Sequence, residues 1–230
     1  EFAPHFFNNL CRGLAEQAIP ATDQGLADWL GRSGLNASLD FDFAQLPESL
    51  RAGLIEGLCD GAALVLQGSR SRRARPWATS FGVGRYGTDY LVRALTAYKG
   101  LGALAPDEAV YAMSDFDGAH QVYDGRQRYR LRFAPGELPP VDGFWSVTLY
   151  DADRFLHPNP KGRHSIGDRT PGLRPDADGG LTLEIAHQPP EGDSNWLPAP
   201  AGNFYLVLRM YLPRPDVRSW PIPPVQKAPA

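Results

Sequence analysis

Two aspartates near the middle of the chain are the first residues whose type and spacing could do chemistry. Asp115 and Asp117 stand two positions apart and are followed by Gly118, a spacing that opens many calcium-binding loops. The twelfth position of such a loop must be a glutamate and here is Arg126, which excludes an EF-hand. Because Asp-x-Asp-Gly is also common turn chemistry, we expect a turn. A divalent cation at Asp115 and Asp117 is left open, and Asp115 is kept as a candidate for moving a proton.

Arg209 is a charged residue inside an apolar stretch. Residues 204–212 read Phe-Tyr-Leu-Val-Leu-Arg-Met-Tyr-Leu and predict a long, largely buried strand. A guanidinium in such a place must be paired or hydrogen-bonded, because an unpaired buried charge is costly. The sequence leaves two alternatives. Arg209 pairs with an internal carboxylate, or it lines a cavity that accepts an anionic or carbonyl ligand.

Two further segments are dense in polar and aromatic residues. Residues 163–169 contain Arg163, His164 and Asp168, but Gly162 comes one position too early for Gly-x-Ser-x-Gly, so a serine-hydrolase nucleophile is not expected. None of the five histidines stands in a zinc-binding spacing, and each is expected at the surface or hydrogen-bonded. Residues 195–200 form a rigid segment that either covers a sheet edge or offers an indole to a ligand.

The first half of the chain is expected to form helices that help to position these residues. Residues 1–105 read mostly as helical, because apolar residues recur there at intervals of three and four. Thr88 is predicted to cap the last of these helices. Helices are expected over residues 6–14, 26–30, 50–58 and 88–98.

The second half reads as strands joined by turns. Residues 127–133 alternate strictly, with Tyr129, Leu131 and Phe133 on one face and arginines on the other, as in a sheet with one buried face. Helices followed by strands predict an α+β chain whose second half is an antiparallel β-sandwich. The proline-rich segment after Pro213 is expected to run extended over the surface. Strands are expected over residues 127–133, 144–150, 181–186 and 204–212.

Composition excludes several classes of function. The formal net charge of −3 gives no basic excess for nucleic acid, and no apolar run approaches the ~20 residues of a membrane span. Residues 82–87 match Gly-x-Gly-x-x-Gly without the strand–helix–strand unit of a nucleotide site, so we expect no nucleotide. Cys11 and Cys59 are expected as buried free thiols, with a disulfide between them left open. We expect a soluble protein whose true N-terminus is missing, and its compartment stays open.

Several blocks of residues resemble one protein family, in the family's order. The blocks are Tyr86–Ala94, Tyr111–Gly118, Leu138–Asp151, Arg163–Thr170, Asn195–Pro200 and Leu208–Pro213. Together they resemble the bacterial and fungal family that carries domain of unknown function 1214 (DUF1214), usually found behind DUF1254. The resemblance implies a β-sandwich of jelly-roll type with a ligand cleft.

The chain departs from this family in two respects. It is too short to hold a complete DUF1254 domain as well, and His164 stands where a tyrosine is expected. A histidine titrates near neutral pH, so His164 becomes an acid/base candidate. We expect a helical segment at 1–105 that packs on the sandwich, the DUF1214-like sandwich at 106–225, and a tail at 226–230.

These residues favour an enzyme without an organic redox cofactor, doing lyase, isomerase or hydrolase chemistry on a small molecule in a cleft of the sandwich. Arginine would hold an anionic group or a developing oxyanion, and an aspartate, histidine or tyrosine would move the proton. The alternative is a non-catalytic module that binds a carbohydrate or apolar ligand on its tryptophans. No metal ligand is assigned, and a homo-oligomer is left open. Catalytic candidates are Asp115, His164, Tyr111, Arg163 and Asp168, and substrate-binding candidates are Tyr90, Arg93, Trp145, Asn195, Trp196, Arg209 and Tyr211.

Overall fold

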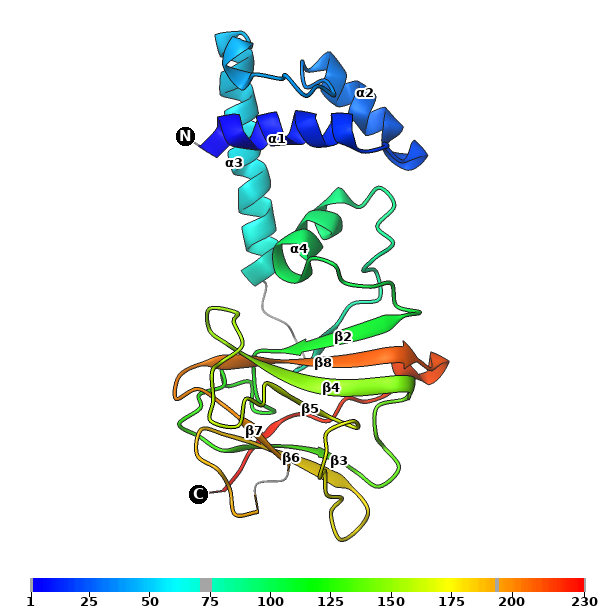
Figure 1. The fold of residues 1–230 in the computed structure, drawn as a ribbon, viewed down its shortest axis with the longest axis vertical. Helices are drawn as coiled ribbons and strands as arrows, with labels where there is room; N and C mark the ends of the chain where they lie inside the picture. Colours follow the sequence, from blue (N-terminus) through cyan, green and yellow to red (C-terminus); the bar gives the residue numbers. More distant parts are fainter. Residues whose placement is uncertain (1, 71–75, 193–194, 230) are drawn as a thin grey trace. The chain divides into compact units, whose positions relative to one another are not determined.

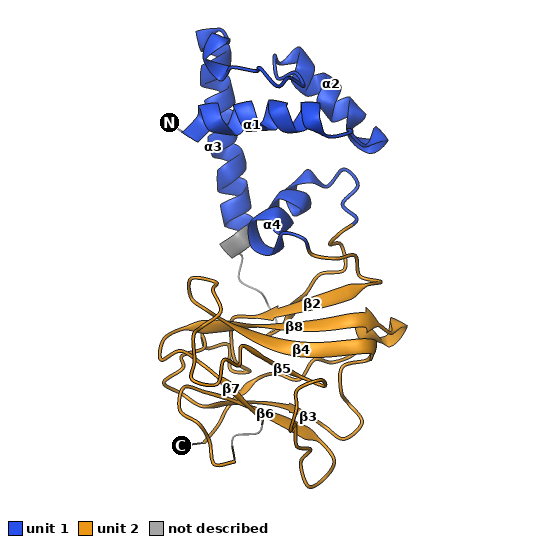
Figure 2. Cartoon of the chain, viewed as in Figure 1, with its two compact units in different colours: residues 1–71, 85–102 blue, residues 72–84, 103–230 orange. Residues whose placement is uncertain are grey.

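The chain divides into two compact units in a computed structural model that describes residues 2–70, 76–192 and 195–229. We call residues 1–71 and 85–102 the helical unit, and residues 72–84 and 103–230 the β unit (Figure 2). The short segment 72–84 therefore belongs with the β unit although it lies between two helices in the sequence. No helix of the described residues is long and apolar enough to cross a membrane.

The helical unit is built on amphipathic helices with a small core of their own. Phe7 and Cys11 lie one turn apart on the buried face of the first helix, and the Phe7 ring stacks on Phe43 at a centroid distance of 5.1 Å. Leu35 completes the centre of this core. The elements are α1 (Phe2–Glu16), η1 (Ala21–Asp23), α2 (Gln24–Arg32), η2 (Phe43–Gln45), α3 (Glu48–Arg70) and α4 (Tyr90–Gly100).

Two local predictions in this unit need correction. The cap of α4 is Asp89 and not Thr88, because the Asp89 carboxylate accepts the Val92 N–H at 3.0 Å and a carboxylate also suits the positive end of the helix dipole. Cys11 is buried as expected, but Cys59 is exposed, and both are free thiols. No disulfide therefore joins them.

The β unit contains two sheets that share one core. A five-stranded sheet has the order β1-β2-β8-β4-β5, and a four-stranded sheet has the order β7-β6-β3-β9 (Figure 1). All described pairings are antiparallel except β6 with β7, which is parallel. The strands are β1 (Ala78–Thr79), β2 (Ala109–Ser114), β3 (Tyr129–Phe133), β4 (Val141–Asp151), β5 (Ser165–Gly167), β6 (Leu181–Ala186), β7 (Trp196–Pro198), β8 (Phe204–Pro213) and β9 (Gln226–Lys227). The α+β class is confirmed.

Period-two alternation decides which side chains enter the core between the sheets. Strand β3 buries Tyr129, Leu131 and Phe133 and exposes the arginines between them, as predicted. In β8 the residues Leu206 and Leu208 are completely buried against the other sheet. The alternate residues of β8 must therefore face away from the core, and Arg209 lies on this outward face.

The proline-rich segment after Pro213 contributes to the fold more than predicted. Gln226 and Lys227, predicted as part of a tail, pair with β3 as the edge strand β9. Val225 is completely buried, and the Trp77 indole N–H donates to the Pro223 carbonyl at 2.8 Å. The segment is thus anchored by a strand and by core contacts, so it does not simply extend over the surface.

Candidate functional site

A row of polar and aromatic side chains lies on the outward face of the five-stranded sheet. Strand register places Tyr111 of β2 opposite Arg209 of β8, and Arg209 opposite Ser146 of β4. Strand β8 lies between β2 and β4 (Figure 1), so the registers place these residues in one row across the sheet. Tyr211 shares this face two positions further along β8. The structure therefore brings together three predicted residues, Tyr111, Arg209 and Tyr211, from two separate parts of the sequence.

Arg209 is held by neutral hydroxyl groups. Its Nη1 donates to Thr148 Oγ1 and its Nη2 to the Tyr150 hydroxyl, both at 2.8 Å. Within the described residues, no carboxylate lies within ion-pair distance of Arg209. The described residues thus give no support to the alternative of an internal carboxylate partner. The positive charge stays available to a ligand, because hydroxyl groups satisfy its donors without neutralising it.

Tyrosines surround this guanidinium. The Tyr150 and Tyr205 rings stack at a centroid distance of 5.2 Å. Burial raises the pKa of Tyr205, while the nearby Arg154 opposes that rise and Asp115 adds to it. Asp115 and Arg209 therefore both lie within electrostatic reach of Tyr205. We call Arg209, Thr148, Tyr150, Tyr205 and Tyr111 the sheet-face cluster.

An aromatic pair extends this face toward the other end of β8. Phe144 and Tyr211 stack at a centroid distance of 4.3 Å. The Arg169 guanidinium lies 4.1 Å from the centre of the Phe144 ring. The face thus has a polar region at the sheet-face cluster and an apolar region beside it.

The tryptophans do not form an open platform. Trp145 and Trp196 are 3% and 5% exposed and belong to the interior of the β unit. The Trp196 indole N–H donates to the Ala186 carbonyl at 2.8 Å, which fixes the ring against β6. The prediction that these two indoles face a ligand is corrected, because strand alternation turns Trp145 into the core and the indole hydrogen bond holds Trp196 inward.

The remaining candidates of this region mostly hold backbone. Asn195 donates to the carbonyls of Arg174 and Thr182, and Arg163 Nη1 donates to the Trp196 carbonyl at 2.9 Å. The exposed Asp168 accepts the backbone N–H of Trp145 at 3.2 Å. These contacts give the three side chains a structural role in joining loops to strands.

His164 differs from its neighbours in one respect. Its Nδ1 is buried and has no hydrogen-bond partner within the described part of the chain. Its backbone carbonyl accepts the Leu149 N–H at 3.0 Å, which extends the pairing of β5 with β4. His164 directly precedes the edge strand β5, and among the described residues no hydrogen bond or ring contact joins its side chain to the sheet-face cluster.

Asp117 forms the turn that its spacing predicted. It is 3% exposed, and its Oδ1 accepts the N–H groups of Ala119 and Gln121, each at 2.9 Å. Among residues 2–70, 76–192 and 195–229, no three histidine, cysteine or acidic side chains meet as ligands for a metal ion. Asp117 Oδ1 is thus engaged by the backbone of its own turn.

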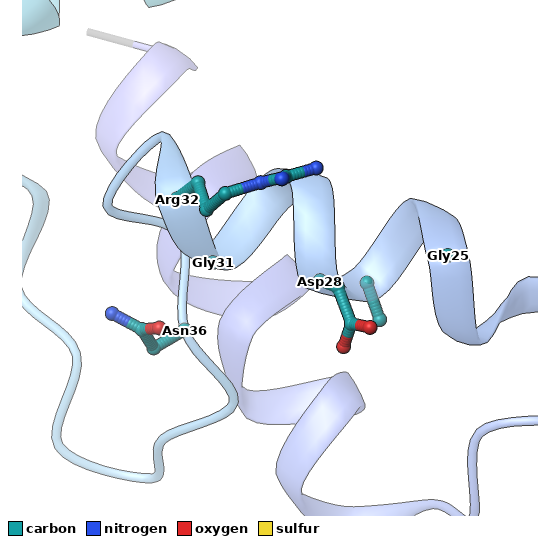
Figure 3. Close-up of a pocket in the computed structure, with 6 residues that line it drawn as sticks. Gly25, Asp28, Gly31, Arg32 and Asn36 are labelled. Carbon is teal, nitrogen blue, oxygen red and sulfur yellow. The ribbon is translucent and has the colours of Figure 1, made fainter.

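Tyr90 and Arg93 lie in the helical unit. Arg93 forms an ion pair with Asp23 at 2.8 Å, and the Tyr90 hydroxyl lies 3.4 Å from the other oxygen of Asp23. Arg93 also lies at the rim of a hollow of about 380 Å³ between α1, η1 and α2. A second hollow of about 550 Å³ is open and has Asp28 and Arg32 on its wall (Figure 3).

Sequence reasoning missed Thr148, Tyr150 and Tyr205. The alternation of residues 144–150 already places Thr148 and Tyr150 on one face of a strand. What the sequence does not give is the pairing of β4 with β8, which brings that face beside Arg209.

The fold and the site together define an α+β protein with a two-sheet domain. Residues 108–215 match the model of the family described as "Protein of unknown function (DUF1214)". The match spans the whole sheet-face cluster.

Two solved structures are similar to this chain. The VPA0106 protein from Vibrio parahaemolyticus is 29% identical with a TM-score of 0.62, over 94% of this chain and 53% of that one. This chain thus spans about half the length of the Vibrio protein. An uncharacterized protein from Burkholderia cenocepacia is 16% identical with a TM-score of 0.38, over 90% of this chain and 49% of that one. No curated protein matches the chain.

Proposed function

We propose that the β unit carries an acid/base active site for a small organic substrate, located at the sheet-face cluster and independent of an organic redox cofactor. The observation that carries the proposal is Arg209, a guanidinium bonded to two hydroxyl groups and to no carboxylate of the described residues. A positive charge fixed in this way suits a carboxylate, a phosphate or a carbonyl oxygen that becomes negative during reaction. A jelly-roll course of the chain through the two sheets remains part of this proposal.

Tyr150 is the proton donor in this scheme. Its oxygen accepts the Arg209 N–H, so its own O–H hydrogen points away from the guanidinium and can be given to a bound molecule. In the proposed step Asp115, which acts electrostatically on Tyr205, takes a proton from carbon while Tyr150 gives its proton to the substrate oxygen. Arg209 stabilises the negative charge that this transfer leaves on the Tyr150 oxygen. The class of reaction is lyase, isomerase or hydrolase chemistry that begins with such a proton transfer.

The scheme is tested by proton exchange with solvent. The full chain is incubated in D₂O with a panel of 2-oxo acids, 2-hydroxy acids and simple ketones, and loss of the C–H signal beside the carbonyl or hydroxyl carbon is followed by NMR. We expect at least one compound to exchange in a protein-dependent way, and Tyr150→Phe to slow this exchange by about 100-fold. Saturable binding of panel compounds without any exchange would instead support a binding module, and would contradict the acid/base assignment.

A further inference from the structure

We propose that the helical unit contains a second ligand site, independent of the sheet-face cluster, which takes an uncharged apolar molecule bearing one carbonyl or hydroxyl oxygen. The site is the hollow of about 380 Å³ bounded by α1, η1 and α2 with Arg93 of α4 at its rim. This volume lies near the lower end of the range of about 300–1,000 Å³ that small-molecule sites occupy.

The walls of the hollow are mostly apolar, with Asn9 and Gln17 also among the lining residues. Leu10 and Leu14 lie one turn apart on α1, Leu26 and Leu30 lie one turn apart on α2, and Ile19 comes from the connection between these helices. All five side chains are only partly buried by the protein itself. An apolar molecule in the hollow would remove further apolar surface from water, which is the main favourable contribution to its binding.

Gly13 keeps the α1 wall open. It lines the hollow between Leu10 and Leu14, and a Cβ placed on it meets no heavy atom within 4 Å. A glycine inside a helix costs about 1 kcal/mol relative to alanine, so the chain loses helix stability at this position. The space above Gly13 is therefore room that a ligand could occupy and that a larger side chain would fill.

An ion pair supplies the polar end of the hollow. Arg93 Nη1 lies 2.8 Å from Asp23, whose side chain is 13% exposed while that of Arg93 is 42% exposed. The guanidinium has five N–H donors, and its contacts with Asp23 and with the Tyr90 ring leave donors for a ligand oxygen.

The charges of this pair decide the class of ligand. A carboxylate ligand would be repelled by Asp23, and an ammonium ligand would be repelled by Arg93. Either ligand would also lose its hydration on entering the hollow, which makes its binding still less favourable. An uncharged oxygen can accept from Arg93 with no such repulsion. The site is thus expected to prefer a neutral head group on an apolar chain.

The test uses the full chain and 2-octanone as the probe, with octanoate and octylamine as charged comparisons of the same length. Binding is measured by isothermal titration calorimetry on wild type, on Gly13→Leu and on Gly57→Leu. Gly57 lies in α3, does not line the hollow and also has no atom within 4 Å of a Cβ, so it is a matched control. Both substitutions replace a helical glycine by a better helix former, and thermal unfolding checks that each variant folds.

We expect wild type and Gly57→Leu to bind 2-octanone with equal affinity, and Gly13→Leu to bind it about tenfold more weakly or worse, because its side chain fills the hollow. The charged comparisons are expected to bind more weakly than the ketone. No binding of 2-octanone to folded wild type, equal affinity in Gly13→Leu, or tighter binding of octanoate would each overturn the proposal.

Discussion

The arginines of the β unit differ in their partners, which are carboxylates for Arg130 and Arg132 and hydroxyl groups for Arg209. Arg130 pairs across strands with Glu184 at 2.6 Å, and Arg132 pairs with Asp176 and Asp178, all at the outward side of the four-stranded sheet. Such exposed pairs contribute little to stability but leave no charge to recruit a ligand. Arg209 lies on the other sheet, where its guanidinium donates to the hydroxyl groups of Thr148 and Tyr150 and lies 5.7 Å from the centre of the Tyr150 ring. This difference in partners is the residue-scale basis of the proposed function.

Buried tyrosines make the protein sensitive to alkali. Burial raises the pKa of Tyr123, Tyr129 and Tyr205 above the ordinary value. The unfolded chain therefore loses these protons first, so the stability they provide is complete below pH ~10 and falls as the pH rises above it. We predict that the free energy of unfolding in urea declines above pH ~10, and that Tyr123→Phe makes the decline shallower. Tyr98→Phe, at an exposed position, serves as the control and should leave the slope unchanged. If the free energy of unfolding fell equally steeply with pH in wild type, Tyr123→Phe and Tyr98→Phe, this explanation would be contradicted.

Substitution of Asp117 tests how much its carboxylate stabilises the turn that it forms. Its carboxylate accepts two backbone N–H groups and is buried, so removing it leaves both donors without a partner. We predict that Asp117→Ala lowers the free energy of unfolding by about 2–3 kcal/mol in urea titrations at neutral pH. Asp142→Ala, at an exposed position of β4, should change it by less than about 0.5 kcal/mol. Equal effects of the two substitutions would show that the turn does not depend on this carboxylate.

At the scale of elements, β5 is held so close to β4 that one methyl group would separate them. A Cβ on Gly167 would lie 2.1 Å from the Trp145 carbonyl oxygen, closer than any real contact. We predict that Gly167→Ala destabilises the protein by about 1–3 kcal/mol, measured by chemical denaturation. Gly82→Ala in the same unit has nothing within 4 Å of its Cβ and should be nearly neutral. A neutral Gly167→Ala would mean that β5 can move away from β4 without cost.

The length of a strand decided whether the sequence could predict it. Strands with strict alternation or a long apolar run, such as β3 and β8, were predicted nearly to their ends, since period two is a local signal. The short edge strands β5, β7 and β9 were not, because two or three residues carry no readable period. The cap of α4 was misplaced by one residue for a similar reason, since Thr88 and Asp89 are both good caps.

The site was predicted only in part, and for a physical reason. Arg209 was recognised because a charge inside an apolar run is unusual, and Tyr111 and Asp115 because they lie in blocks that resemble the family. Thr148 and Tyr150, the hydrogen-bond partners of Arg209, lie 61 and 59 residues from it in the chain, and only the register of β4 against β8 joins them to it. Trp145 and Trp196 were misjudged because an indole in a strand does not by itself show which side of the sheet is solvent.

At the scale of the whole molecule, the two units differ in how completely they are buried. Leu206 and Leu208 of β8 are completely buried, and β8 has a paired strand on each side. Helix α3 has a different character, since Ile55, Leu64 and Leu66 are exposed large apolar side chains. We predict that backbone amides of β8 exchange with deuterium far more slowly than those of α3, because their opening requires unfolding of the β-unit core. Hydrogen-exchange mass spectrometry on the full chain measures both, and slower exchange in α3 would reverse this order of stability.

The family and the solved relatives constrain the molecule without assigning an activity. The DUF1214 match covers residues 108–215, while the chain as a whole spans about half of the Vibrio protein. The residues of the sheet-face cluster all lie inside the matched part, whereas the hollow of the helical unit lies outside it. The two proposed sites can therefore be tested separately, and failure of one leaves the other standing.

The most direct test of the central claim is the rate of C–H exchange in D₂O for Arg209→Lys, measured on the panel compound that wild type exchanges fastest. Lysine keeps the charge but cannot bond to Thr148 and Tyr150 with the same fork. We predict that Arg209→Lys exchanges the compound about 100-fold more slowly than wild type and unfolds at the same urea concentration. The control is Arg128→Lys, at an exposed position just before β3, which should exchange the compound at the wild-type rate. Equal rates in Arg209→Lys and wild type would show that the guanidinium takes no part in the chemistry.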